Sequence, residues 1–136
     1  MNVLLFMTPK SQIKFCDDSM SIRQVLEILE YYRYTTIPLL TKNGKYKGSI
    51  SEGDLLFYLK NHPFKSIEDF NNVNIGDVQR YKSYLPITSH EDMSNLIITC
   101  TNQNFVPIVD DSTNFIGIVT RKSIINYLYL NSNKEE

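Results

Sequence analysis

The sequence lacks the features that mark several large classes of protein. It has only two cysteines, Cys16 and Cys100, which stand in hydrophobic contexts without CxxC spacing, so we expect reduced and buried thiols. The formal net charge of −1 offers no basic field that would hold nucleic acid or an anionic membrane surface. No run of about 18 apolar residues and no signal-peptide pattern occur, so we expect a cytoplasmic chain without a membrane span.

Catalytic constellations are also missing. The sequence shows no nucleophile beside a base, no paired carboxylates, no Walker loop and no GxGxxG motif. His62 and His90 have no cysteine or acidic partners at metal-ligand spacing. We therefore expect no enzyme activity, no catalytic residues, and no metal or cofactor.

What the sequence does contain is an internal repeat. Residues 36–51 align with residues 105–120 without a gap, at one constant offset, as from Pro38 to Pro107. A duplication of this length predicts two copies of one structural unit. The same offset pairs Gly48 with Gly117, Ser51 with Thr120, Tyr58 with Tyr127 and Leu59 with Leu128.

Each copy shows the same order of predicted elements. An amphipathic helix comes first, and in the first copy it opens on Ser21 and Gln24, which are spaced as a capping box. Two short strands joined by a turn follow, and a second helix then opens on Ser51 or Thr120. The leading helices have apolar faces formed by Ile22, Val25, Leu26 and Leu29 in the first copy and by Met93, Leu96, Ile97 and Cys100 in the second. The predicted strands are 37–40 and 46–50 in the first copy and 106–109 and 115–119 in the second. The second helices cover 54–59 and 123–128.

The repeat also predicts the organisation of the chain. The first motif covers residues 1–60, and a connector covers 61–74, where residues 66–70 form a short helix. The second motif covers 75–130 and a polar tail covers 131–136. Together the two motifs make one domain.

With these elements the chain resembles the CBS-domain family, specifically a stand-alone bacterial pair of CBS motifs, also called a Bateman module. The resemblance implies an α/β (α+β) fold: two βαββα motifs in tandem with pseudo-twofold symmetry, their small sheets packed by amphipathic helices. It also implies a homodimer, because such pairs commonly dimerise. The residues that carry it are Met7-Thr8-Pro9, Ile37-Pro38-Leu39, Gly48-Ser49-Ile50-Ser51, Ile75-Gly76-Asp77-Val78, Val106-Pro107-Ile108-Val109 and Gly117-Ile118-Val119-Thr120.

The family's signature for ribose and phosphate is matched in the first copy by Gly48, Ser51 and Asp54. A carboxylate can accept two hydrogen bonds from a ribose diol, and a hydroxyl with free amides at a helix start suits phosphate. Ser51 as N-cap with Asp54 at the third helical position also describes an ordinary capped helix, so both interpretations stay open. The full set of expected nucleotide-binding residues is Ile13, Lys14, Tyr34, Thr35, Thr36, Ile37, Ser51, Gly53, Asp54, Thr120, Arg121 and Lys122.

Two parts of this set have their own alternatives. Tyr34 can stack on a purine, or it can serve packing. In the second copy Ser123 replaces the ribose acid, while Arg121 and Lys122 can bind phosphate or can form only a solvated helix start. We therefore expect at most one full-strength nucleotide site per chain.

Three functions follow as hypotheses. The first is a regulatory module that binds an adenosine nucleotide of the AMP, ADP or ATP class in the cleft between the motifs and signals to a partner protein, whose identity the sequence does not give. The second is a cyclic di-AMP receptor, because residues 34–38 and 120–122 resemble small CBS proteins that bind this ligand. The third is a ligand-free module that dimerises through the helices at 54–59 and 123–128.

Overall fold

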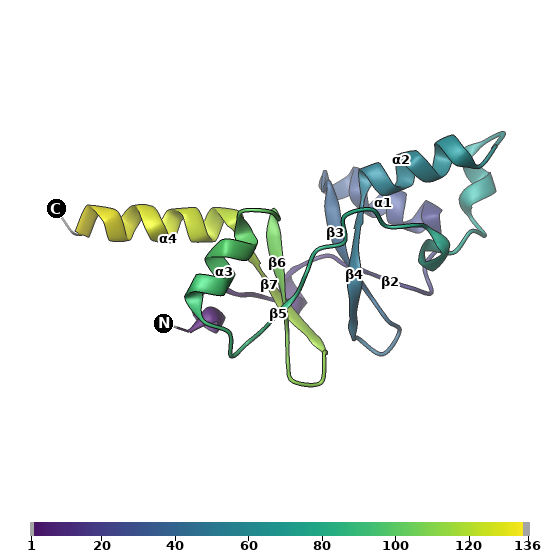
Figure 1. Ribbon diagram of the computed structural model, residues 1–136. Coiled ribbons are helices and arrows are strands. Elements are labelled where there is room, and N and C mark those ends of the chain that lie inside the picture. The colour runs from purple at the N-terminus through teal and green to yellow at the C-terminus, as the bar shows by residue number, and fades with distance from the viewer. Residues whose placement is uncertain (1, 135–136) are drawn as a thin grey trace. The chain divides into compact units, whose positions relative to one another are not determined.

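The chain folds as two compact units in a computed structural model that describes residues 2–134 (Figure 1). The first-copy unit is Lys14–Ser83. The second-copy unit combines the described residues up to Ile13 with those from Tyr84 onward. Each unit has its own sheet, its own pair of helices and its own core.

The first-copy unit has the predicted βαββα order. It runs through β2 (Cys16–Asp17), α1 (Ile22–Tyr32), β3 (Thr36–Leu40), β4 (Tyr46–Ser51) and α2 (Glu52–Asn61). The sheet order is β2-β3-β4, with β2 parallel to β3 and β3 antiparallel to β4. Pro38 lies just before the two residues of β3 that pair with β2, so its missing N–H falls outside that ladder.

The second-copy unit repeats this order with β5 (Ile87–Thr88), α3 (Met93–Cys100), β6 (Phe105–Val109), β7 (Phe115–Thr120) and α4 (Arg121–Lys134). Its hairpin keeps the register of the first copy: Phe105 pairs with Thr120 where Thr36 pairs with Ser51. Both hairpins carry a bulge at the same place, after Leu39 in one and after Ile108 in the other. The predicted fold class, two βαββα motifs in tandem, is therefore confirmed.

Local sequence signals explain the leading helices. In α1 the Ser21 hydroxyl accepts the Gln24 N–H at 3.2 Å, and the Gln24 side chain accepts the Ser21 N–H at 2.9 Å, which is the predicted capping box. The helix ends at Arg33, whose φ of 58° is left-handed. In α3, Asp92 caps the helix by accepting the Asn95 N–H at 2.9 Å.

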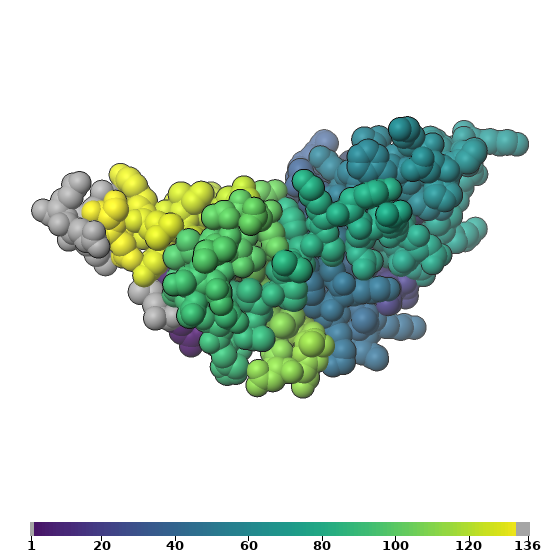
Figure 2. Space-filling model, in the orientation of Figure 1, coloured from purple at the N-terminus to yellow at the C-terminus, as the bar shows by residue number. Residues whose placement is uncertain are grey.

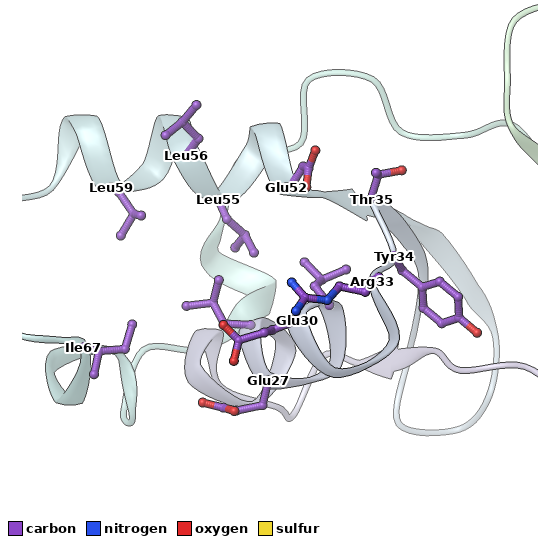
Figure 3. Close-up of a pocket in the computed structure, with 12 residues that line it drawn as sticks. Glu27, Glu30, Arg33, Tyr34, Thr35, Glu52, Leu55, Leu56, Leu59 and Ile67 are labelled. Atoms are coloured by element: carbon purple, nitrogen blue, oxygen red, sulfur yellow. The ribbon is translucent and has the colours of Figure 1, made fainter.

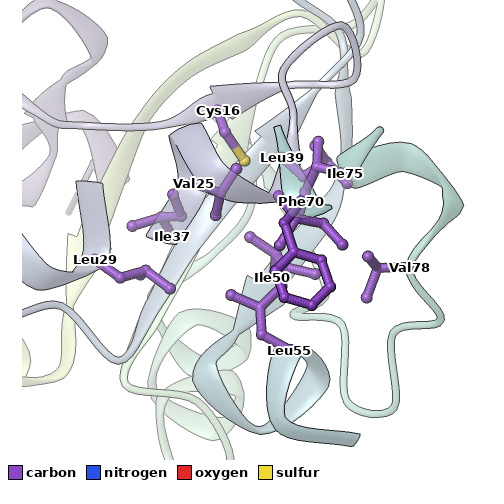
Figure 4. Close-up of a cluster of buried hydrophobic side chains, with 11 residues drawn as sticks. Cys16, Val25, Leu29, Ile37, Leu39, Ile50, Leu55, Phe70, Ile75 and Val78 are labelled. Atoms are coloured by element: carbon purple, nitrogen blue, oxygen red, sulfur yellow. The ribbon is translucent and has the colours of Figure 1, made fainter. Parts of the chain in front are cut away.

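The core of the first-copy unit lies between its sheet and its helices (Figure 4). The connector contributes to it, because Phe70 at the end of η3 (Ile67–Phe70) is only 3% exposed. The predicted short helix at 66–70 is thus a 3-10 turn that anchors the connector. The buried cluster comprises Cys16, Ile22, Val25, Leu29, Ile37, Leu39, Ile50, Leu55, Phe70, Ile75 and Val78.

The opening segment of each sequence copy packs in the unit of the other copy. At the N-terminus, η1 (Val3–Phe6) buries Val3, and β1 (Thr8–Pro9) pairs with β7; η2 (Lys10–Gln12) follows. In the segment between α2 and β5, which we call the linker, η4 (Ile75–Asp77) buries Ile75 in the first-copy core. The sequence repeat did not predict this exchange, and the motif boundaries at residues 60 and 75 stay a prediction.

Gly117 shows why the N-terminal strand fits. A Cβ placed on Gly117 would lie 2.4 Å from the Thr8 carbonyl oxygen and 2.7 Å from the Met7 sulfur. Backbone atoms cannot move aside as the end of a flexible side chain can, so β1 can lie this close to β7 only over a glycine.

The final helix, α4, extends beyond the strands of its own unit (Figure 1), and part of one side of it is visible at the surface in the space-filling view (Figure 2). Near the start of α4, Ile124 packs in the core of the unit and is only 2% exposed. Among residues 2–134 no helix has the length and apolar character needed to cross a membrane.

Candidate functional site

The start of α2 brings Ser51 and Asp54 together. The Ser51 hydroxyl accepts the Asp54 N–H at 3.1 Å, and the Asp54 carboxylate accepts the Ser51 N–H at 2.9 Å. These two bonds form a capping box, which is the structural interpretation of this pair. The carboxylate also stands where the helix dipole favours negative charge.

The Asp54 carboxylate has a second backbone partner. Its other oxygen accepts the Tyr81 N–H from the linker at 3.0 Å, and the residue is only 3% exposed. Asp54 therefore fixes both the helix start and the linker in the first-copy unit. Each carboxylate oxygen has a further lone pair, so a ribose contact stays a prediction beside this structural role.

Strand β3 lies directly beside this helix start. The Glu52 N–H donates to the Thr35 carbonyl at 2.9 Å, and Thr36 pairs with Ser51. Ile37 as a whole is only 1% exposed, so it lies behind this surface, and a ligand contact to it stays a prediction. The structure thus brings together six of the predicted residues: Thr35, Thr36, Ile37, Ser51, Gly53 and Asp54.

Gly53 supplies an available donor at this helix start. Glu52 and Asp54 use their N–H groups in the bonds above, whereas the Gly53 N–H makes no hydrogen bond within residues 2–134. A Cβ on Gly53 would approach nothing closer than the Ser51 hydroxyl at 3.6 Å, so the space on the side-chain face of this residue is open. A free amide at a helix N-terminus is a suitable donor for an anion.

Lys14 and Tyr34 belong to an aromatic cluster that also contains two tyrosines not foreseen from the sequence. The Tyr34 ring stacks on Tyr32 with centroids 5.7 Å apart and planes 13° apart. Tyr31 meets Tyr32 edge-on at 4.7 Å, and the Lys14 ammonium lies 5.2 Å from the Tyr32 centroid. Tyr34 is 40% exposed, so part of its ring is open to a stacking partner.

Tyr32 is the functional candidate that sequence reasoning missed. It contacts Tyr34 on one side and Lys14 on another, so it holds both predicted ligand-binding side chains in place. The feature of the sequence that could have indicated Tyr32 is the Tyr-Tyr-Arg-Tyr run at the end of α1. The left-handed turn at Arg33 lets Tyr34 fold back over Tyr32.

The predicted residues of the second copy lie in the second-copy unit. The Thr120 hydroxyl accepts the Ser123 N–H at 3.1 Å and caps α4. The Arg121 Nε donates to the Cys100 carbonyl at 2.8 Å, so this side chain is anchored on the end of α3. Lys122 is exposed, and Ile13, which follows η2, is half-buried in the same unit.

Arg121 and Lys122 are cations without acidic partners. Within the described part of the chain neither forms an ion pair. The first copy has Glu52 and Gly53 at the equivalent positions, so the charge at the two helix starts is opposite. Phosphate would meet attraction at the start of α4 and repulsion from Glu52 at the start of α2.

A pocket of about 260 Å³ borders Asp54 in the first-copy unit. Phe57 and Tyr81 meet edge-on across one side of it, with ring centroids 5.1 Å apart. His62 also lines it, stacked on Tyr58 at 3.9 Å, and its Nδ1 lies 3.0 Å from the Tyr58 carbonyl. Among residues 2–134 no three His, Cys, Asp or Glu side chains gather to hold a metal ion.

The two cysteines are buried and uncharged. Burial raises the pKa of the Cys16 thiol to about 12, and Cys16 Sγ donates to the Pro38 carbonyl at 3.5 Å. Burial also raises the pKa of Cys100. Both thiols therefore stay protonated at neutral pH, where only a thiolate would act as a nucleophile or metal ligand.

Comparison with known proteins places this arrangement in a family. The family model of the CBS domain matches residues 5–61 and 76–130. The A-adding tRNA nucleotidyltransferase of Aquifex aeolicus (strain VF5) is 29% identical over 109 residues, which are 80% of this chain and 12% of that enzyme. The chain thus spans a small part of this curated relative.

Two solved structures share the fold over nearly the whole chain. CbpB in complex with c-di-AMP has a TM-score of 0.86 and 24% identity, and the match covers 100% of this chain and 91% of CbpB. CBSX2 in complex with AMP has a TM-score of 0.74 and 22% identity, and the match covers 96% of this chain and 98% of CBSX2. At such low identity the likeness is one of fold.

Proposed function

The chain belongs to the CBS-domain family, and from this premise we propose that it is a non-catalytic regulatory module that binds an adenine nucleotide. The observation that carries the proposal is the convergence, in the first-copy unit, of a free helix-start amide at Gly53, the Ser51 hydroxyl and the strand at Thr36. CbpB and CBSX2, which share the fold, are seen with c-di-AMP and AMP, and this supports an adenine ligand.

Each part of the ligand has a matching group. The exposed part of the Tyr34 ring, held by Tyr32, would stack on the adenine. The backbone of Thr36, which is half-buried, would read the base edge, with Ile37 buried behind it. The Gly53 N–H and the Ser51 hydroxyl would donate to a phosphate or to the ribose.

Cyclic di-AMP is the second candidate ligand. Arg121 and Lys122 have no acidic partners, and two phosphates need more positive charge than one. The likeness of fold to CbpB supports this candidate as well. Replacing Arg121 by Ala should then weaken cyclic di-AMP binding more than AMP binding in a calorimetric titration, and equal losses would count against it.

The stacking contact gives the sharpest test of the adenine site. Tyr34→Ala should weaken binding of AMP or cyclic di-AMP by about 5- to 150-fold, because stacking on an aromatic side chain is worth about 1–3 kcal/mol. Tyr31→Ala is the matched control: Tyr31 is 80% exposed, belongs to the same cluster and does not contact Tyr34 in it. An equal loss of nucleotide affinity in the two variants would show that Tyr34 does not stack on the ligand.

Nucleotide binding would act by shifting a conformational equilibrium that a partner protein reads, so ligand and partner affinities would be linked reciprocally. The homodimer belongs to the same proposal. It is supported by large exposed apolar side chains on both second helices, including Leu56 on α2 at 61% and Ile125 on α4 at 56%. Co-purification with and without nucleotide would identify the partner. Recovery of the same amount of partner in both cases would contradict regulation by the nucleotide.

A ligand-free interaction module is the remaining alternative. It is favoured by the same exposed side chains and by the use of Asp54 in structural hydrogen bonds. It predicts a dimer and no binding heat with AMP, ATP or cyclic di-AMP. The titration therefore separates it from the nucleotide sensor.

A further inference from the structure

Gln103, in the loop before β6, is a buried polar side chain of the second-copy unit and is only 6% exposed. Its Oε1 accepts the Leu85 N–H at 2.8 Å. Its Nε2 donates to the carbonyl oxygens of Leu85 and Phe105, each at 3.1 Å. These partners fix the orientation of the side-chain amide, because a backbone N–H can only donate and a carbonyl oxygen can only accept.

The backbone groups that Gln103 binds lie where the ladder between β5 and β6 stops. Ile87 pairs with Ile108 in this parallel ladder. Two residues earlier, the Leu85 carbonyl would need the N–H of Pro107, which proline lacks. The carboxamide of Gln103 supplies the missing donor and also takes up the Leu85 N–H. Gln103 therefore closes a backbone edge that the two strands leave open.

The first copy leaves the equivalent edge free. By the registers of the two sheets, Lys14 is equivalent to Leu85, and Tyr34 is equivalent to Gln103. Within residues 2–134 the backbone N–H and carbonyl of Lys14 make no hydrogen bond. The Tyr34 side chain points away from the pocket between α1 and α2 (Figure 3), and its ring stacks on Tyr32. The two copies thus differ in whether this edge can receive another molecule.

A carboxamide and adenine present the same pair of groups to such an edge. Each carries an N–H donor beside an acceptor, which are Nε2 and Oε1 in glutamine and the N6 amino group and a ring nitrogen in adenine. Lys14 and Thr36 are predicted to contact the nucleotide in the first copy. Gln103 binds the backbone of their equivalents, Leu85 and Phe105, in the second.

We propose that the Gln103 carboxamide is an internal mimic of the adenine edge, which closes the base site of the second-copy unit and confines base binding to the first. The inference rests on the proposed adenine site. It goes beyond that site by assigning the closure to one side chain and not only to the missing ribose acid at Ser123. The residue at this position, tyrosine or glutamine, then determines whether a copy accepts a base.

A substitution in the first copy tests whether a glutamine can close an open edge. Tyr34→Gln should bind AMP about tenfold more weakly than Tyr34→Met in a calorimetric titration, because both variants lose the ring and only glutamine can occupy the Lys14 edge. Tyr34→Met is the matched control, since its side chain has a similar length and no carboxamide.

The Leu85 amide reports directly on the second copy. Gln103→Gly frees the Leu85 N–H, so its hydrogen exchange should become about tenfold faster or more, and adenosine should restore the protection. N6,N6-dimethyladenosine, which lacks the N–H donor, should not restore it. Gln103→Met fills the space without pairing, so neither nucleoside should protect the amide there. Circular dichroism checks the fold of each variant, and Gln103→Ala replaces the glycine variant if that one is unfolded.

The outcomes separate this inference from the proposed function. Exchange at Leu85 in Gln103→Gly that adenosine leaves unchanged would overturn the inference even where the wild type binds AMP, because Gln103 would then be a structural contact only. Equal AMP affinities of Tyr34→Gln and Tyr34→Met would overturn it as well. A wild type that gives no heat with AMP would instead refute the proposed function, and the exchange measurement would still determine the role of Gln103.

Discussion

Replacing Asp54 by alanine removes a carboxylate that accepts the Ser51 N–H at 2.9 Å and the Tyr81 N–H at 3.0 Å from a position only 3% exposed. Hydrogen bonds to a charged group contribute about 1.5–3 kcal/mol each, and the bond to Ser51 overlaps with the helix cap, worth about 1 kcal/mol. We expect Asp54→Ala to lower the free energy of unfolding by about 3 kcal/mol. The loss is large against a typical total stability of about 5–15 kcal/mol.

Urea unfolding followed by circular dichroism measures this loss. Two controls isolate the carboxylate: Glu52→Ala removes an exposed acid in the same turn, and Ser123→Ala removes the equivalent side chain in the second copy. Both should change stability by less than about 1 kcal/mol, because neither residue contributes a buried carboxylate. An Asp54→Ala chain as stable as these controls would show that the capping and linker bonds do not hold the unit together.

The same prediction governs how ligand binding to Asp54 variants is interpreted. A weaker nucleotide affinity in Asp54→Ala would arise from a lost ribose contact or from a disordered helix start. The nucleotide affinity of Ser51→Ala sets the scale, because this variant removes the other half of the capping box together with a hydroxyl proposed to contact the ligand, and it leaves the carboxylate with its Tyr81 partner. A ribose contact requires Asp54→Ala to lose much more affinity than Ser51→Ala.

Three further perturbations test local features. Thr113 has a φ of 65° where the first copy has Gly44, so Thr113→Gly should stabilise the chain by about 0.5–1 kcal/mol in urea unfolding, while Ser112→Gly in the same turn should not. Gly117→Ala should displace β1, cost about 1–3 kcal/mol and expose the segment around Thr8 to proteolysis; unchanged cleavage would contradict the close approach of these strands. Because burial raises the Cys16 pKa from 9.0 to about 12, unfolding releases a proton above pH 9, and this contribution to stability is lost as pH rises toward 12. Between pH 8 and 10 the wild type should lose roughly 1.4 kcal/mol more than Cys16→Ala, and equal losses would refute the shifted thiol.

Features that rest on local chemistry could be predicted from the sequence. The Ser21 capping box, the turn at Gly44 and the apolar face of α1 each follow from residues a few positions apart. The repeat then extended each prediction to the second copy. The bulge at the same position in both hairpins was not predicted and is a further likeness between the copies. The family resemblance, confirmed by the match to the CBS domain, supplied the fold.

Features that rest on distant contacts could not be predicted in this way. The second partner of Asp54 is the Tyr81 amide, 27 positions away in a segment without periodicity. The two-residue strand β1 is too short to show an alternating pattern, so its pairing with β7 was not visible. Tyr32 was missed because its role depends on the fold-back at Arg33, a conformation that the residue type does not reveal.

The central claim is that the first-copy unit binds an adenine nucleotide, and isothermal titration calorimetry of the wild-type chain tests it most directly. The account predicts saturable heat with AMP or cyclic di-AMP, at no more than about one full-strength adenine site per chain, and a clearly weaker affinity in Tyr34→Ala but not in Tyr31→Ala. An absence of heat with AMP, ADP, ATP and cyclic di-AMP would contradict it.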